Sequence, residues 1–240
     1  MPIFENDRCL LCHEEIKPNI GWNYLISKQL KKYLCEICES KLEFIEGETC
    51  RICNRPFNNL EPEYRKNDLC LDCVRWEKDE NWSGCFERNT SLLIYNDFLK
   101  ETIALYKFRG DYVISKAFSS LLKEKLDKLS YDILVPIPLS QERLFERGFN
   151  QAEAFITEAW RAPCNILKRI HTEKQSKKSR NERIHFEQVF QINETTSEIT
   201  DKRILLIDDI YTTGSTLRHA AKVLKKAGAH SVSSLTLARG

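Results

Sequence analysis

Two groups of residues in this sequence have the types and the spacing that chemistry requires. One is a series of four Cys-x-x-Cys pairs, and the other is the stretch 204–216, where two adjacent aspartates precede a run of threonine, glycine and serine. Paired cysteines are typical metal ligands, whereas acids beside hydroxyl groups suit a sugar phosphate. The sequence therefore predicts a metal-binding region and a sugar-phosphate site in one chain.

The cysteine pairs lie in the first third of the chain. They are Cys9/Cys12, Cys35/Cys38, Cys50/Cys53 and Cys70/Cys73. Two pairs complete a tetrahedral four-thiolate shell, so we predict two structural zinc ions. A redox motif would need a single pair near a strand–helix–strand unit rather than four pairs in series. Sharing of each ion by consecutive pairs is favoured because a cross-braced arrangement closes longer loops, but both arrangements remain open.

The order of residues in the second group suits a phosphorylated sugar. Backbone N–H groups at a helix start, with neighbouring hydroxyls and a glycine that permits close approach, form a cradle for a phosphate. These residues are Thr212, Thr213, Gly214, Ser215 and Thr216. Asp208 and Asp209 repel phosphate but accept hydrogen bonds from sugar hydroxyls beside it. We favour a 5-phosphoribosyl site over an ordinary turn rich in small residues.

The elements that must position this site alternate between strand and helix after about residue 90. Apolar patterning predicts strands over 91–95, 132–138, 203–207 and 231–237, helices over 97–108, 113–129, 151–159 and 215–227, and a loop over 208–214. Such alternation predicts an α/β domain with a parallel sheet and helices on both faces. We therefore expect a metal-binding module over residues 1–87 and an α/β domain over 88–240.

Charge is divided unequally between these two parts. Residues 1–87 carry 12 Lys+Arg against 17 Asp+Glu, a net charge of −5, and the remainder carries +7. Residues 168–183, expected to be a loop, hold seven cations and two acids, so we predict that single-stranded nucleic acid binds there. The proposed contacts are Lys174, Lys177, Lys178 and Arg180. With no long apolar run and no basic, apolar leader, the expected location is the cytoplasm.

The second group resembles the phosphoribosyl-pyrophosphate motif of type I phosphoribosyltransferases. The motifs around Lys107, Val135, Arg143 and the 204–216 loop also occur in the order seen in the ComF family, whose longer members share the four cysteine pairs. The resemblance implies a type I phosphoribosyltransferase-like sheet behind a zinc domain. It places ribose hydroxyls, and so the catalytic positions, on Asp208 and Asp209, the 5′-phosphate on Thr212 to Thr216, and Mg2+ mainly on pyrophosphate and ribose oxygens.

Arg143 and Arg147 follow the proline-bearing strand, where transferases of this fold bind pyrophosphate. Guanidinium groups suit that ligand, although the two side chains can equally form a solvated helical face on which Glu146 pairs with Arg143. His185 stands where the family usually carries asparagine.

The resemblance also implies a function. The ComF family is linked to the handling of incoming single-stranded DNA during natural transformation, with a competence helicase of the ComFA type as partner. Because no nucleobase pocket can be read from the sequence, we favour a binding module that uses phosphoribosyl pyrophosphate or a related ribose phosphate without turnover. The alternative is an active Mg2+-dependent phosphoribosyltransferase with an unknown acceptor.

Overall fold

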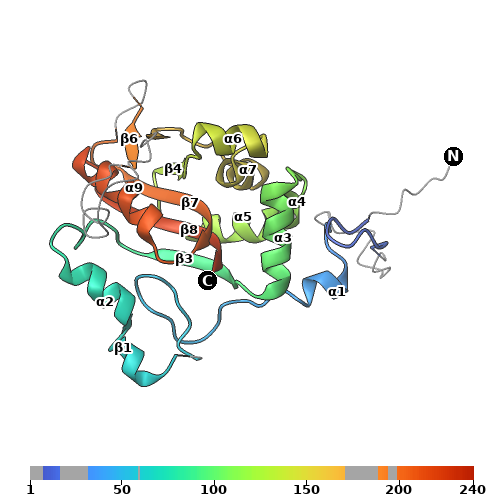
Figure 1. Cartoon of the computed structure of the whole chain (residues 1–240), viewed down its shortest axis with the longest axis horizontal. Helices are drawn as coiled ribbons and strands as arrows, with labels where there is room; N and C mark the ends of the chain where they lie inside the picture. The colour runs from blue at the N-terminus through green and yellow to red at the C-terminus, as the bar shows by residue number, and fades with distance from the viewer. Residues whose placement is uncertain (1–7, 17–31, 59, 171–188, 194–198) are drawn as a thin grey trace, which may run out of the picture.

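The computed structural model describes residues 8–16, 32–58, 60–170, 189–193 and 199–240 of the 240-residue chain. At its centre lies a four-stranded sheet in the order β3-β8-β7-β4 (Figure 1). All three pairs of neighbouring strands are parallel. The strands are β3 (Asn89–Ile94), β8 (Ser231–Arg239), β7 (Arg203–Tyr211) and β4 (Ile133–Pro136). The predicted parallel sheet is confirmed.

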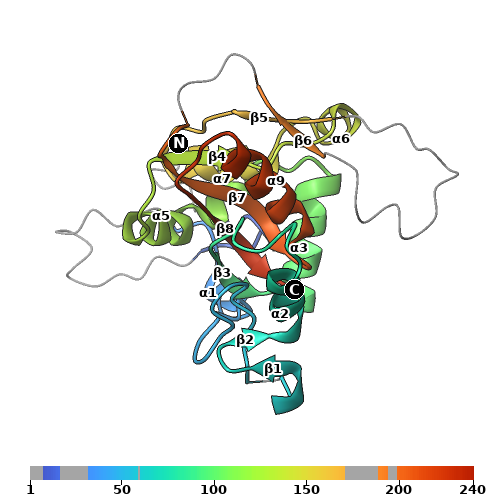
Figure 2. The ribbon, with the colours of Figure 1, turned by 90° about the vertical axis from the view of Figure 1, so that its left-hand side faces the viewer.

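Side chains of the strands alternate between two faces, and helices cover both. Along β7, Leu205 and Ile207 belong to one apolar cluster, whereas Ile204 and Leu206 belong to the other. Figure 2 shows α5 and α9 on opposite sides of the strands. The first cluster includes residues of α3 (Asp97–Phe108), α5 (Ser119–Lys128) and α7 (Gln151–Glu158), and the second includes residues of α9 (Ser215–Lys226). Burial of both faces is usual for a parallel sheet.

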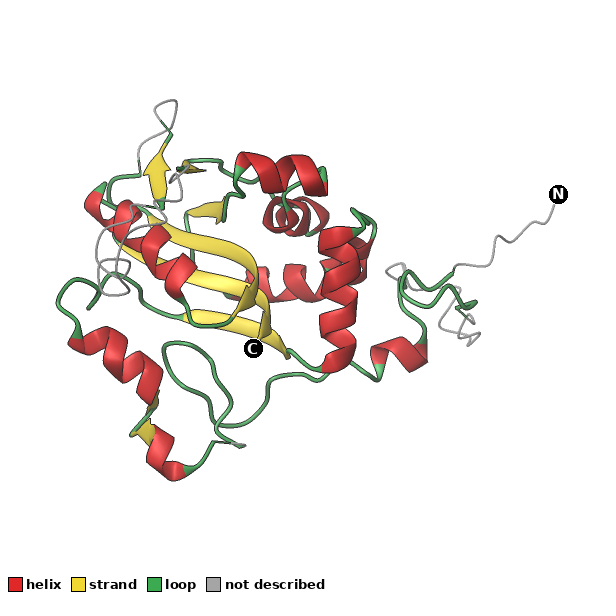
Figure 3. Ribbon diagram, viewed as in Figure 1, coloured by secondary structure: helices red, strands yellow, loops and turns green. Residues whose placement is uncertain are grey.

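Capping explains where several helices begin and end (Figure 3). Asn96 and Asn150 precede α3 and α7, and each side chain accepts a hydrogen bond at 2.9 Å from a backbone N–H of the first helical turn. Helix α6 (Gln141–Arg147) ends at Gly148, whose φ of 76° is the left-handed conformation that favours glycine. The helix predicted over 97–108 has those bounds in the structure, and the helix predicted over 151–159 ends one residue earlier.

The strand that carries the two aspartates is longer than expected. The sequence predicts a loop over 208–214, but β7 continues to Tyr211. Asp208 is paired with Thr236 and Tyr211 with Arg239, because β8 extends to Arg239 and provides partners for the additional residues. Asp208 and Asp209 therefore lie within the sheet, where the strand register determines the direction of their side chains. Only Thr212 to Gly214 remain between β7 and α9.

Two further segments differ from expectation. The single helix predicted over 113–129 is divided into α4 (Ile114–Ala117) and α5 at Phe118, whose side chain is buried in the first apolar cluster. Lys168 and Arg169, expected in a loop, lie in β5 (Leu167–Arg169), which pairs antiparallel with β6 (Phe190–Ile192). Burial of Leu167 and Phe190 explains why these two strands form. Residues 171–183 of the predicted basic loop lie outside the described residues.

The cysteine-rich region covers an open edge of the sheet. Strand β3 is the edge strand, and Ile94 N donates a hydrogen bond to Glu43 O at 2.8 Å, while Ile45 N donates one to Leu92 O at 3.1 Å. Covered edges protect a sheet from unwanted pairing. The elements of this region are α1 (Glu36–Glu39), η2 (Pro62–Tyr64), β1 (Arg65–Lys66), β2 (Leu69–Cys70) and α2 (Leu71–Lys78).

None of the helices in the described part of the chain combines the length and the apolar character that a bilayer span requires.

Candidate functional site

A pocket of about 210 Å³ opens at the carboxyl ends of β4 and β7. Ligands of open α/β sheets commonly bind in this position. Both aspartates, both arginines of α6 and two residues of the hydroxyl-rich loop line it. The full lining is Lys107, Ile137, Pro138, Leu139, Arg143, Arg147, Asn150, Gln151, Ala152, Arg169, Asp208, Asp209, Ile210, Thr212 and Thr216. The fold therefore brings together residues that are up to 109 positions apart in the chain.

The two aspartates have different surroundings although they are adjacent. Asp209 is buried, and its Oδ2 lies 2.5 Å from Nζ of Lys107, which reaches the pocket from α3. Asp208 Oδ1 accepts a hydrogen bond from the backbone N–H of Asp209 at 2.9 Å. Loss of solvent around its carboxyl group, and then the charge of Asp209, raise the pKa of Asp208 to about 7. Near neutral pH, Asp208 can thus both donate and accept hydrogen bonds.

Four cations surround these two acids. Lys107 comes from α3, Arg143 and Arg147 from α6, and Arg169 from β5. Nη1 of Arg147 donates a hydrogen bond to Oε1 of Gln151 at 2.8 Å, so this guanidinium is held in place at the pocket. The lining carries more positive than negative side chains, and guanidinium groups bind phosphate oxygens bidentately. The pocket can therefore bind a polyanion beside groups that accept hydrogen bonds from a sugar.

Both the backbone conformation at residue 214 and the side chain of Tyr211 require a glycine at this position. Its φ is 79°, and a Cβ at this position would lie 2.1 Å from the hydroxyl oxygen of Tyr211. Thr212 and Thr216 line the pocket, whereas Thr213, Gly214 and Ser215 are not part of its lining. The backbone of this short turn thus follows a path that no residue with a side chain can adopt without displacing Tyr211.

Sequence reasoning missed several residues of this pocket. No local pattern assigns a role in the site to Lys107, Asn150 or Gln151, although all three line the pocket. Arg169 was assigned to the basic loop, whereas the structure places it at the pocket. The four predicted nucleic-acid contacts, Lys174, Lys177, Lys178 and Arg180, and also His185, lie outside the described residues.

The eight paired cysteines form two groups of four, in consecutive order. They are Cys9, Cys12, Cys35 and Cys38, and Cys50, Cys53, Cys70 and Cys73; within each group the four sulfur atoms lie within 4.8 Å of one another. Sulfur atoms 2.3 Å from one tetrahedral zinc ion would be about 3.8 Å apart. Both groups can hold a metal ion and fit a zinc module, and they correspond to the favoured consecutive sharing.

The second cysteine group is linked through Trp76 and Arg239 to the end of β7 and to the hydroxyl-rich turn that follows it. Trp76, in the helix that carries Cys73, donates a hydrogen bond from its indole N–H to the carbonyl oxygen of Thr213 at 3.2 Å. Arg239 donates to the carbonyl oxygen of Cys53 at 3.1 Å and to that of Tyr211 at 3.2 Å. Hydrogen bonds from Trp76 and Arg239 thereby join the second cysteine group to Tyr211 and Thr213.

A buried arginine lies at the same junction. The side chain of Arg218, in α9, is 0% exposed and donates to Oε1 of Glu77 at 3.1 Å. Its guanidinium also lies over the rings of Trp76 and Phe86, at 5.1 and 5.3 Å from their centroids. One carboxylate and two aromatic faces compensate this buried charge, while Nε and Nη2 have no hydrogen-bond partner among the described residues.

Comparison with known proteins agrees with this architecture. Residues 150–240 match the model of the phosphoribosyl transferase domain family. "Competence protein ComFC" of Bacillus subtilis (strain 168) is 40% identical over 96% of this chain and 94% of its own length. The protein of the same name from Streptococcus pneumoniae is 35% identical over 97% of this chain and 100% of its own length. "Competence protein F" of Haemophilus influenzae is 27% identical over 98% of both chains. The chain belongs to the ComF family of competence proteins.

Proposed function

We propose that this protein binds a ribose phosphate, with phosphoribosyl pyrophosphate as the preferred ligand, and acts on or with internalised single-stranded DNA in natural transformation. The observation that carries the ligand is the pairing of Asp208 and Asp209 with Lys107, Arg143, Arg147 and Arg169 in one pocket. The acids suit sugar hydroxyls, and the cations suit pyrophosphate. The names of the relatives support the role in competence.

In this proposal the 5′-phosphate lies at the start of α9. Thr212 and Thr216 face the pocket, and a helix start offers free backbone N–H groups and a positive dipole end. Mg2+ is carried mainly by oxygens of the ligand, because Lys107 already occupies one oxygen of Asp209. The two cysteine groups would hold two structural zinc ions, and residues 1–87 and 88–240 form two units of one cytoplasmic protein.

The proposed macromolecular partners are single-stranded DNA and a competence helicase of the ComFA type. The basic stretch that contains Lys174, Lys177, Lys178 and Arg180 joins β5 to β6, and Arg169 of β5 lines the pocket. Replacement of these four residues by glutamine should weaken oligonucleotide binding and flatten its dependence on salt, since each phosphate contact contributes about 0.7 to the log–log slope. Equal binding by the variant would disprove the assignment.

Ligand-induced thermal stabilisation tests the ribose-phosphate site. Phosphoribosyl pyrophosphate with Mg2+ should raise the melting temperature of the wild-type protein as the ligand concentration increases. Asp209→Asn should weaken this binding at least tenfold, because it removes a charged acceptor and leaves Lys107 without its partner. Asp201→Asn is the matched control, since Asp201 is exposed, precedes the amino end of β7 and is not part of the pocket lining. An unchanged melting curve at millimolar ligand would contradict the proposal.

The alternative function is an active Mg2+-dependent phosphoribosyltransferase. It is favoured by the four cations, which can stabilise pyrophosphate as it leaves with the electron pair of the broken C1′–O bond while an acceptor forms the new bond to C1′. Release of pyrophosphate in the presence of candidate acceptors, abolished by Asp209→Asn, would establish turnover. Ligand binding without release in every acceptor series would favour the binding module.

A further inference from the structure

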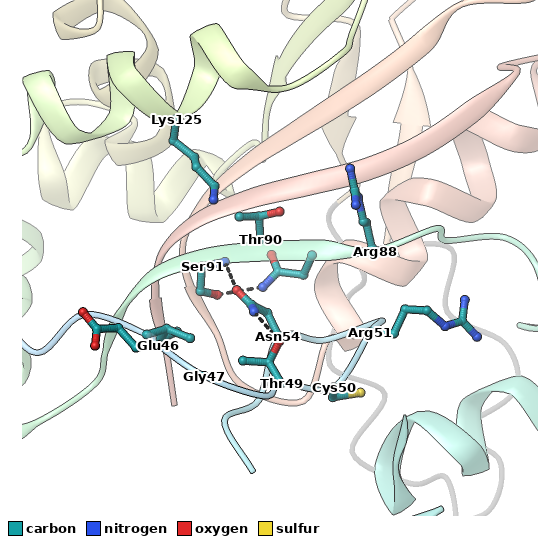
Figure 4. Close-up of a pocket in the computed structure, with 12 residues that line it drawn as sticks. Glu46, Gly47, Thr49, Cys50, Arg51, Asn54, Arg88, Thr90, Ser91 and Lys125 are labelled. Carbon is teal, nitrogen blue, oxygen red and sulfur yellow. Dashed lines mark hydrogen bonds between the residues drawn. The ribbon is translucent and has the colours of Figure 1, made fainter. Parts of the chain in front are cut away.

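A second pocket, of about 380 Å³, lies where the cysteine-rich region meets the edge strand β3 (Figure 4). It shares no residue with the ribose-phosphate pocket. It opens beside Asn89 to Ser91, at the amino end of β3, whereas the ribose-phosphate pocket opens at the carboxyl ends of β4 and β7. Its volume falls within the usual range for small-molecule sites. We call it the seam pocket.

The wall of the seam pocket is held in place by Asn54. Its Oδ1 accepts a hydrogen bond from the backbone N–H of Ser91 at 2.8 Å, and its Nδ2 donates one to Oγ1 of Thr49 at 3.0 Å. Figure 4 shows this amide between the loop of the cysteine-rich region and β3. Asn89 N donates to Ile52 O at 2.6 Å on the same edge. The pocket is thus formed before any ligand binds, which lowers the entropic cost of binding.

Positive charge dominates the rim of the seam pocket. Arg51, Arg88 and Lys125 line it, against the single acid Glu46. Arg51 is paired with Asp68 at 2.6 Å, but neither Arg88 nor Lys125 has an ion-pair partner within the described ranges.

Lys125 differs from its neighbours on α5. Lys123 and Lys128 each pair with a carboxylate of the same helix, at 2.6 Å, and belong to an ordinary solvated face. Lys125 is half-buried, and Figure 4 shows its ammonium group directed toward Thr90. A cleft that presents cations without close ion-pair partners attracts anions, so the ammonium group of Lys125 is available to an anion in the pocket.

We propose that the seam pocket binds a phosphate ester. An ammonium group, a guanidinium and the hydroxyl of Thr90 provide charge and hydrogen-bond donors for phosphate oxygens, and the volume leaves room for the attached nucleoside. The phosphate can belong to a free nucleotide or to the backbone of a nucleic-acid strand, because both present the same group. The inference goes beyond the proposed function, since it concerns a different pocket with different residues.

The test uses the full-length protein and two probes. Binding of thymidine monophosphate is measured by calorimetry, and binding of a fluorescein-labelled oligothymidylate by anisotropy over a salt series. The double variant Arg88→Gln/Lys125→Gln should bind whichever probe the wild-type protein binds at least tenfold more weakly than the wild-type protein does. If the probe is the oligonucleotide, the log–log salt slope should fall by about 1.4, for two phosphate contacts on a single strand. Lys123→Gln, on the same helix but outside the pocket, should behave as wild type.

Each outcome of this experiment decides the proposal. Weaker binding of the mononucleotide assigns the site to free nucleotides, and weaker binding of the oligonucleotide alone assigns it to a strand. Wild-type protein that binds neither probe, or a double variant equal to wild type with both, overturns it. A charge reversal, Lys125→Glu, should weaken binding further. The double variant and Lys125→Glu should still show the rise in melting temperature with phosphoribosyl pyrophosphate. Failure of the seam-pocket proposal is therefore distinguishable from failure of the proposed function.

Discussion

The two cysteine groups have the same ligands but differ in how they contact the rest of the molecule, since Cys9 and Cys38 belong to the first apolar cluster and Cys50, Cys53, Cys70 and Cys73 to the second. The backbone hydrogen bonds around Cys9 and Cys35 remain among residues 8–16 and 32–42, as between Cys9 N and Glu14 O and between Leu10 N and Tyr33 O. None of those bonds reaches β7 or α9 within the described ranges. The group at Cys50 to Cys73 instead contacts Thr213, Tyr211, Arg218 and Arg239 directly or through Trp76 and Glu77.

This difference predicts that the first cysteine group stabilises its own part of the chain, whereas the second also supports the ribose-phosphate site. A metal ion in the first group would stabilise the described residues 8–16 and 32–40, which bury only Cys9, Leu34 and Cys38 among their apolar side chains. An ion in the second group would also hold α2, and with it the indole that binds the carbonyl oxygen of Thr213. We therefore expect loss of the second ion to change ribose-phosphate binding and loss of the first to leave it unchanged.

The largest expected effect comes from removal of one ligand of each group in turn. Cys73→Ser should lose one zinc ion and weaken binding of phosphoribosyl pyrophosphate more than tenfold, whereas Cys35→Ser should lose one ion and bind within twofold of wild type. Colorimetric zinc release, with about two ions expected from the wild-type protein, and calorimetry measure the two quantities. Stepwise chelation of the Cys35→Ser protein repeats the test on a chain whose remaining ion is the second.

Equal ligand affinity in the Cys73→Ser and Cys35→Ser proteins would remove the distinction between the two groups. Loss of both ions from Cys35→Ser would contradict consecutive sharing.

A smaller effect is expected from Arg218→Met. The variant removes a buried ion pair and two ring contacts at the junction of the second group with α9, but Glu77 is partly exposed and regains water. We expect a loss of about 2 kcal/mol in the free energy of unfolding. Lys41→Met is the control beside the first group, where an exposed ammonium lies over Phe98, and should cost less than about 0.5 kcal/mol. Equal losses of unfolding free energy in Arg218→Met and Lys41→Met, measured by urea denaturation, would mean that both junctions contribute equally to stability.

Local patterns were sufficient to predict most elements of the sheet domain. Helix α3 begins after a capping Asn96 and carries regularly spaced apolar residues, so its bounds could be found from the sequence. The end of β7 could not, because Asp208 and Asp209 are typical of loops and stay in the strand only through pairing with β8. The division at Phe118 likewise depends on a tertiary contact rather than on periodicity.

Those parts of the site that form contiguous sequence motifs could be predicted, and those that depend on tertiary contacts could not. Asp208, Asp209 and the hydroxyls lie in one contiguous motif, and the cysteine spacing is itself a signature of metal binding. Lys107 comes from a helix about 100 residues earlier, and its role depends on the direction in which Asp209 leaves the sheet. The contact between Trp76 and Thr213 joins residues 137 positions apart, and no local pattern indicates it.

The smallest and most specific test of the comparison is Trp76→Phe. The substitution keeps an aromatic ring over Arg218 but removes the N–H group that binds the carbonyl oxygen of Thr213. One hydrogen bond contributes about 1 kcal/mol, so the loop should lose about that much of its bias toward the binding conformation. Affinity for phosphoribosyl pyrophosphate should then fall about fivefold, while zinc content stays at the wild-type value. Trp160→Phe is the control, because Trp160 is exposed and distant from both cysteine groups in the sequence. Unchanged affinity in Trp76→Phe, measured by calorimetry with wild-type zinc content, would show that the second group contacts the loop without positioning it.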